Sequence, residues 1–92
     1  MAYRFTASRV GSGDVVFPDE IIIDYDEQIL VYRKPSLRGY QSTTIRFAAI
    51  GSVSVSNGLM FRDVIIETNG GKTIRAKGFS VFDAQRIAKL LS

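Results

Sequence analysis

Asp63 to Leu91 reads DVIIETNGGKTIRAKGFSVFDAQRIAKLL, and this stretch decides the fold. Its first part predicts a β-hairpin, because two runs rich in Ile, Val and Thr flank the turn Asn69-Gly70-Gly71. Its second part predicts a helix, because apolar residues there recur at helical spacing. The sequence therefore ends in an antiparallel hairpin followed by a helix.

The length of the turn sets the register of this hairpin. A three-residue loop pairs Ile66 with Ile74, so that apolar side chains meet on one face. A two-residue loop would set Ile66 opposite Thr73 and mix the two faces, so we expect the three-residue loop. The outward side chains of the second strand are then Thr73, Arg75 and Lys77. Asp63 is expected opposite Lys77, as an ordinary cross-strand ion pair.

The helix is expected to begin after Ser80, a residue type that favours the N-cap, and Asp83 complements the helix dipole. One apolar stripe follows at i, i+3, i+4 and i+7 spacing, made of Ala84, Ile87, Ala88 and Leu91. The polar residues Gln85, Arg86 and Lys89 lie largely off that stripe. A helix this short is marginal by itself, so we expect it to pack on the sheet.

Short runs rich in β-branched and aromatic residues fill the chain before this stretch. Turn residues separate them, which is the pattern of antiparallel sheet. The expected strands cover residues 3–8, 15–17, 21–25, 29–33, 40–47 and 52–56. Asn57-Gly58 follows the last of these as a strong hairpin signal. The sequence thus predicts a mainly β, α+β chain of about seven strands with one C-terminal helix.

Size and composition restrict what the chain can be. A length of 92 residues allows a single domain over 1–92, and the 46% hydrophobic content supplies a core. The sequence contains neither cysteine nor histidine, which excludes disulfides, thiolate metal sites and the usual zinc ligand and proton carrier. We therefore expect no enzyme activity, no metal and no cofactor. The net charge of +3 favours anionic partners only slightly.

The N-terminal residues Met1 to Thr6 lack the apolar core of a secretory signal. The apolar runs are far shorter than the roughly 20 residues of a membrane-spanning helix. We expect a soluble, cytoplasmic protein with no transmembrane segment.

From Ile21 to Leu91 the chain resembles bacterial pleckstrin-homology-like domains, in the superfold shared with GRAM domains. The resemblance begins with IIIDYDEQILVY, an apolar strand, an acidic turn and a second strand. The basic loop RKPSLRGYQ follows, then TTIRFAAIGSVSVSNG with a short kink at a buried isoleucine, Ile50, and finally the hairpin and helix above. It implies a partly open barrel of two nearly orthogonal antiparallel sheets, with the helix plugging one end.

The resemblance also implies a binding or scaffolding module, and several bacterial members look like ring-forming oligomers. In eukaryotic pleckstrin-homology domains, basic residues around an early hairpin contact phosphoinositide headgroups. The corresponding candidates for an anionic-ligand site here are Arg33, Lys34, Arg38 and Arg46. The plainer alternative is that charge on an exposed hairpin serves solubility and edge protection.

Other candidate sites are better explained by structure than by chemistry. The acidic residues Asp24, Asp26 and Glu27 could ligate calcium, but they lack the calcium-loop spacing and suit a turn between strands. The glycine-rich segments precede no helix, so they are turns and not phosphate loops. The four tyrosines do not form the paired aromatic motif of an RNA-recognition sheet.

Three functions follow, from different classes. The first is a protein-interaction or self-assembly module that uses an exposed strand edge, for which the segment from Tyr40 to Thr44 is a candidate. The second is peripheral binding to anionic membranes, with Leu37 inserting at the tip of the basic hairpin. The third is a nucleic-acid-binding β-barrel, against which the C-terminal position of the helix argues.

Overall fold

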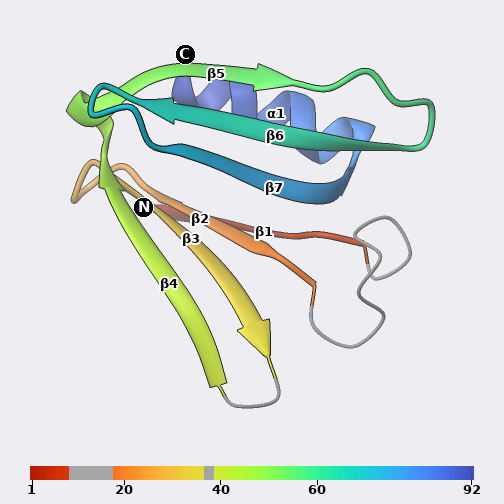
Figure 1. Ribbon diagram of the computed structural model, residues 1–92, viewed down its shortest axis with the longest axis horizontal. Coiled ribbons are helices and arrows are strands. Elements are labelled where there is room, and N and C mark those ends of the chain that lie inside the picture. Colours follow the sequence, from red (N-terminus) through yellow and green to blue (C-terminus); the bar gives the residue numbers. More distant parts are fainter. Residues whose placement is uncertain (9–17, 37–38) are drawn as a thin grey trace.

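Two antiparallel sheets and one helix make up the computed structural model, which describes residues 1–8, 18–36 and 39–92. The strands are β1 (Ala2–Thr6), β2 (Glu20–Asp24), β3 (Ile29–Ser36), β4 (Gly39–Arg46), β5 (Ile50–Val55), β6 (Phe61–Thr68) and β7 (Thr73–Ser80). The helix is α1 (Val81–Leu91). One sheet has the order β1-β2-β3-β4 and the other β5-β6-β7, and Figure 1 shows them as separate layers that do not close into a barrel. The predicted fold class is confirmed. The expected strand at 15–17 lies outside the described residues.

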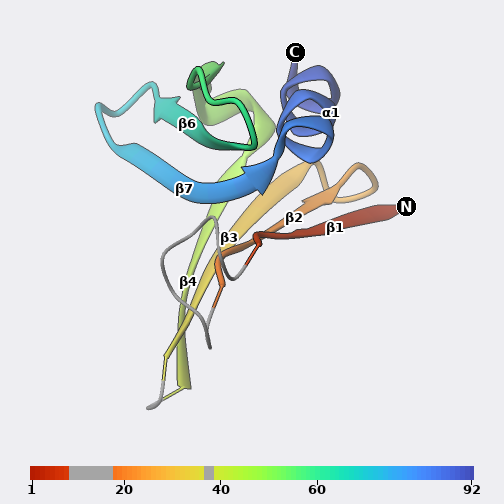
Figure 2. The same cartoon turned by 90° about the vertical axis from the view of Figure 1, so that its right-hand side faces the viewer.

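The first sheet buries one face because its side chains alternate across the pleat. Ile21 and Ile23 of β2 and Leu30 of β3 are fully buried. Their neighbours in sequence point to the opposite, outer face, where Glu20, Ile22 and Val31 are only partly covered. Figure 2 shows the β3–β4 hairpin projecting well away from the second sheet and the helix.

A single turn of 3₁₀ helix, Phe47–Ala49, carries the chain from the first sheet to the second. It occupies the position of the predicted kink. Ile50, expected there as a buried residue, is only partly buried, because it packs against the margin of the core and not within it. β5 then presents Ser52 and Ser54 to solvent and turns Val53 toward the core, as its alternation predicted.

The β6–β7 hairpin has the predicted register, with Ile66 opposite Ile74 and Val64 opposite Ala76. The predicted pairing of Asp63 with Lys77 is wrong. A β-bulge shifts the register between Arg62 and Val64, and Asp63 instead forms an ion pair with Arg75, with 2.8 Å between Oδ2 and Nε. The bulge was not foreseen, and it changes the partner of each residue beyond it.

The helix α1 has the predicted cap and apolar stripe. The Ser80 hydroxyl oxygen accepts a hydrogen bond from the backbone N–H of Asp83 at 3.1 Å. Ala84 and Ile87 are fully buried. α1 packs against β5, β6 and β7, and Arg86 extends over the rings of Tyr3 and Phe5 on β1. The helix therefore spans from the second sheet to the first edge strand of the other.

Candidate interaction edge

β4 is the last strand of its sheet, and β3 is its only strand neighbour within the described chain. Figure 1 shows β4 at the outer edge of its sheet, with no other described strand beside it. Most of its side chains are exposed, including Tyr40 at 61% and Thr44, while Ile45 is 6% exposed and anchors the strand to the core. In an edge strand, every second residue directs its N–H and C=O away from the sheet. β4 thus offers a row of backbone groups to another strand.

Apart from Arg46 at its end, the strand carries none of the features that normally protect an edge. Natural edge strands are blunted by charged residues, proline, bulges or a covering segment. From Gly39 to Ile45 the sequence GYQSTTI contains no charge and no proline. Its pairing with β3 is regular from Ile29–Arg46 to Ser36–Gly39, without a bulge. Its length, its regular register and its neutrality from Gly39 to Ile45 are those of an edge that is suited to pairing.

The other edges are shorter, charged, partly covered or irregular in the described structure. β1 has five residues against eight in β4, and it carries the exposed charge of Arg4. At β7, the Gly78 carbonyl accepts a hydrogen bond from the N–H of Ser8 at 2.9 Å. β5 is shorter than β4 and has an irregular register near Ile50. Among these strands, β4 has the most accessible edge.

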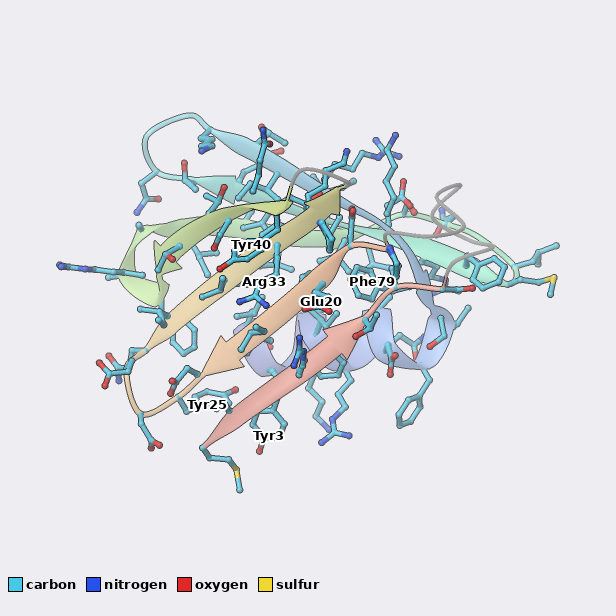
Figure 3. The ribbon with its side chains drawn as sticks, turned by 90° about the horizontal axis from the view of Figure 1, so that it is seen from below. Tyr3, Glu20, Tyr25, Arg33, Tyr40 and Phe79 are labelled. Atoms are coloured by element: carbon cyan, nitrogen blue, oxygen red, sulfur yellow. The ribbon has the colours of Figure 1, made fainter. Side chains whose placement is uncertain are left out.

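Arg33, the first of the predicted anion-site residues, is engaged within the protein. Its guanidinium lies 4.6 Å from the ring centroid of Tyr40 and 4.0 Å from the Glu20 carboxylate. Glu20 also pairs with Arg4 at 2.9 Å. Figure 3 shows Arg33 between Tyr40 and Glu20, on the outer face of the sheet. This arrangement ties β2, β3 and β4 together and places the charge of Arg33 beside a carboxylate that Arg4 shares.

The buried Nε of Arg33 has no hydrogen-bond acceptor among the residues that the structure describes. The guanidinium therefore remains capable of one more donation, although its side chain is only 31% exposed. The stacking on Tyr40 holds that side chain against the β3–β4 hairpin.

The remaining predicted anion-site residues do not form one cluster. Lys34 is exposed on β3, opposite Gln41 of β4. Arg46 is exposed at the opposite end of the hairpin, across from Ile29, where it lines a shallow hollow with Glu27. Arg38, like Leu37, lies outside the described residues. The structure thus brings Arg33 and Lys34 to the same half of the hairpin and leaves Arg46 at its base.

A second hollow, of about 580 Å³, lies between α1 and the β2–β3 turn. Its lining residues are Tyr25, Phe82, Gln85, Arg86, Lys89 and Leu90. The Tyr25 hydroxyl donates to the Leu90 carbonyl, and its ring makes edge contacts with Tyr3 and Phe47. Sequence reasoning missed this hollow. The signal that could have indicated it is Phe82, an aromatic residue off the apolar stripe of the helix.

The buried polar residues of the described chain have a structural role. Asp19 is 6% exposed, and its carboxylate accepts hydrogen bonds from the Tyr32 hydroxyl at 2.8 Å and the Lys77 backbone N–H at 3.2 Å. Burial raises the pKa of Tyr32 far above its ordinary value, and the hydrogen bond to Asp19 and the charge of that carboxylate raise it further. This pair links the two sheets.

Neither hollow contains an acid–base or metal-binding group set. Within the described ranges 1–8, 18–36 and 39–92, no cluster of three potential metal ligands occurs. Asp24 and Asp26, which the sequence assigned to a turn in preference to a calcium site, serve the β2–β3 turn, where the Asp24 carboxylate accepts a hydrogen bond from the Asp26 N–H. No described helix is long and apolar enough to cross a membrane.

Comparison with protein families gives a match over most of the chain. The family model described as "Bacterial PH domain" matches residues 14–92, which include β2 to β7 and α1. The match begins a few residues before the expected start of the resemblance at Ile21, and only β1 lies outside it. No curated protein and no solved structure matches the chain.

Proposed function

We propose that this chain, which belongs to the bacterial PH domain family, is a single non-catalytic module that associates with protein by pairing a strand with its β4 edge. The proposed association is self-assembly. The proposed module acts in the cytoplasm. The absence of histidine and cysteine from the sequence supports the non-catalytic role.

The observation that carries the proposal is the edge position of β4, with a regular register and no charge from Gly39 to Ile45. Main-chain hydrogen bonds supply affinity when a strand is added to a sheet edge, and side chains on alternate residues supply selectivity. The exposed ring of Tyr40 and the hydroxyls of Ser42 and Thr44 are the side chains available for that selectivity. The engagement of Arg33 with Tyr40 holds this part of the edge in place.

Binding to anionic membrane is the second candidate, through the predicted site residues Arg33, Lys34, Arg38 and Arg46. The exposed ammonium of Lys34 on the projecting hairpin favours it. The ion pairing of Arg33 with Glu20 argues against it, because that charge is already partly neutralised. A nucleic-acid-binding barrel has less support, since the same few free cations would have to contact phosphates.

The test is light scattering coupled to size exclusion, over a series of protein and salt concentrations. Thr44→Lys places a charge on the β4 edge, and Gln85→Lys adds the same charge on the exposed face of α1. We expect the wild type and Gln85→Lys to associate in a salt-resistant manner and Thr44→Lys to remain monomeric. A wild type that stays strictly monomeric at high concentration overturns the self-assembly proposal.

Vesicle sedimentation separates the second candidate from the first. Preferential binding to anionic over neutral vesicles that is lost in Lys34→Glu would favour the membrane role. Equal sedimentation with the two vesicle types would exclude it.

A further inference from the structure

We infer that the strand added to β4 is β4 of a second copy of this chain, antiparallel to it, about a two-fold axis that passes beside Thr43. This inference rests on the proposed function, and it adds the strand that pairs with β4, the symmetry and the register.

The identity of the partner follows from the edges that the fold leaves accessible. Pairing between two different edges would need a second accessible edge on the same molecule. In the described structure β1 is short and carries a charge, β5 has an irregular register, and the edge of β7 accepts a hydrogen bond from Ser8. β4 is neutral from Gly39 to Ile45, so two copies of this part meet without repulsion between like charges. Such an interface is the same surface on both subunits, and it closes at a dimer.

Symmetry restricts the register. Two neighbouring antiparallel strands are related by a two-fold axis that is perpendicular to the sheet, and this rotation preserves which face each side chain occupies. Each residue of β4 must therefore pair with a residue of the second copy that lies on the same face of the sheet. Tyr40, Ser42 and Thr44 lie on one face of β4, and Thr43 and Ile45 on the other. Because neighbouring residues of β4 lie on opposite faces, the axis must pass beside one residue and not between two neighbouring residues.

Two positions of the axis use nearly the whole strand: one beside Ser42 and one beside Thr43. With the axis beside Ser42, Ile45 faces Gly39 of the partner subunit, which has no side chain to offer. With the axis beside Thr43, this threonine faces its own copy, and Ser42 faces Thr44 of the partner subunit. Hydroxyl pairs of this kind stabilise antiparallel sheets, so the Thr43 register is favoured.

The Thr43 register also gives Arg46 a partner. It sets Arg46 opposite Tyr40 of the partner subunit, whose ring is 61% exposed although Arg33 of its own chain already lies against it. A guanidinium near an aromatic ring is stabilised by the ring quadrupole, and the symmetry creates this contact twice. In the dimer, the base of the hairpin of one subunit thereby meets the outer half of the hairpin of the other subunit.

Cysteine cross-linking tests the register directly, because the sequence contains no cysteine of its own. Directly opposed residues in an antiparallel pair have Cα atoms about 4.5–5.5 Å apart, which is within the range that a disulfide spans. Only the residue beside the axis faces its own copy. We expect Thr43→Cys to form a covalent dimer on mild oxidation and Ser42→Cys to form much less of it. Thr73→Cys, at an exposed position of β7, should form no covalent dimer.

The outcomes separate this inference from the proposed function. Stronger cross-linking of Ser42→Cys than of Thr43→Cys overturns the register. Cross-linking of both at the level of Thr73→Cys overturns the two-fold pairing, and the proposed function survives that result if Thr44→Lys still abolishes association in light scattering.

A second variant keeps the test valid if Thr43→Cys does not fold. Arg46→Ala should raise the dissociation constant of the dimer about five- to thirty-fold, because two symmetric contacts with Tyr40 are lost. Lys34→Ala, which removes an equal charge from the same hairpin, should leave that constant unchanged. Equal effects of the two variants contradict the proposed contact.

Discussion

Two carboxylates hold the backbone of β7 where the ladder with β6 is interrupted. Asp19 accepts a hydrogen bond from the Lys77 N–H, and Asp63 accepts one from the adjacent Gly78 N–H, each at 3.2 Å. A bulge leaves backbone donors without a partner strand, and buried donors need an acceptor. Asp63 of β6 and Asp19, which directly precedes β2, supply it here, so these carboxylates are part of the scaffold.

Gly78 is the residue on which this bulge depends. Its φ is +84°, a conformation that side chains other than glycine rarely adopt, and the residue is buried. We expect Gly78→Ala to lower the free energy of unfolding by about 1–3 kcal/mol, as measured by urea denaturation. Gly70→Ala is the control, since a Cβ there meets only the Thr68 hydroxyl at 4.0 Å. Equal losses in the two variants would show that backbone strain at Gly78 is not the cause.

Because of Tyr32, the free energy of unfolding is expected to fall at alkaline pH. Its pKa is raised in the folded state, so the protonated phenol is favoured by folding, and its stabilisation is fully present below the unfolded pKa of about 10. As the pH rises above 10, the unfolded chain releases this proton first, and stability falls. Tyr32→Phe should lower stability at neutral pH by about 1–2 kcal/mol, because Asp19 loses a donor, and should flatten the alkaline decline.

The measurement is thermal unfolding at closely spaced pH values from neutral to strongly alkaline. Tyr40→Phe serves as the control, because this tyrosine is largely exposed. An alkaline decline that is as steep in Tyr32→Phe as in the wild type would assign the effect to other groups.

Among the elements, the regular parts were predictable and the irregular ones were not. The Ile66–Ile74 pairing follows from apolar alternation, which is a local pattern in the sequence. The bulge beside Asp63 is also held by the Asp19 carboxylate, which comes from elsewhere in the chain. An isolated glycine such as Gly78 within a strand is nevertheless a known sign of a bulge. The unforeseen bulge also explains why Asp63 was expected to pair with Lys77 and pairs with Arg75 instead.

The candidate site was predicted in part for similar reasons. The segment from Tyr40 to Thr44 was expected at an edge, and the structure places it there, because turn lengths and strand order restrict which strand ends a sheet. The engagement of Arg33 with Glu20 was not predicted, since these residues become neighbours only when β2 pairs with β3. Whether Arg33, Lys34, Arg38 and Arg46 bind an anion stays a prediction.

The helix cap is the element-level feature with the clearest energetic consequence. Ser80 satisfies the Asp83 N–H at the end of a short helix that would not be stable alone. Ser80→Ala should lower the free energy of unfolding by about 1 kcal/mol. Ser54→Ala, on the exposed face of β5, should change it by less than about 0.5 kcal/mol. A Ser80 variant as stable as the Ser54 variant in urea would contradict a stabilising cap.

At the scale of the whole molecule, the β3–β4 hairpin is the part that the core supports least. Ile45 and Leu30 anchor it at its base, whereas its outer half projects from the body of the protein. Stacking of Arg33 on Tyr40 and pairing with β2 hold this half in the single chain. A second copy along β4 would complete the pairing of the hairpin on its free side, so dimerisation and the stability of the fold should be coupled.

Coupling of this kind makes the melting temperature depend on protein concentration. A dimer that dissociates on unfolding gains stability by mass action, and the melting temperature should rise roughly 3–5 °C for each tenfold increase in concentration while the dimer is populated. Thr44→Lys, with a charged edge, should melt at a temperature that does not vary with concentration, and Gln85→Lys should follow the wild type. A wild-type melting temperature that is constant across the concentration series would mean that the edge of β4 remains unpaired in solution. The neutrality of Gly39 to Ile45 would then require an explanation other than self-pairing.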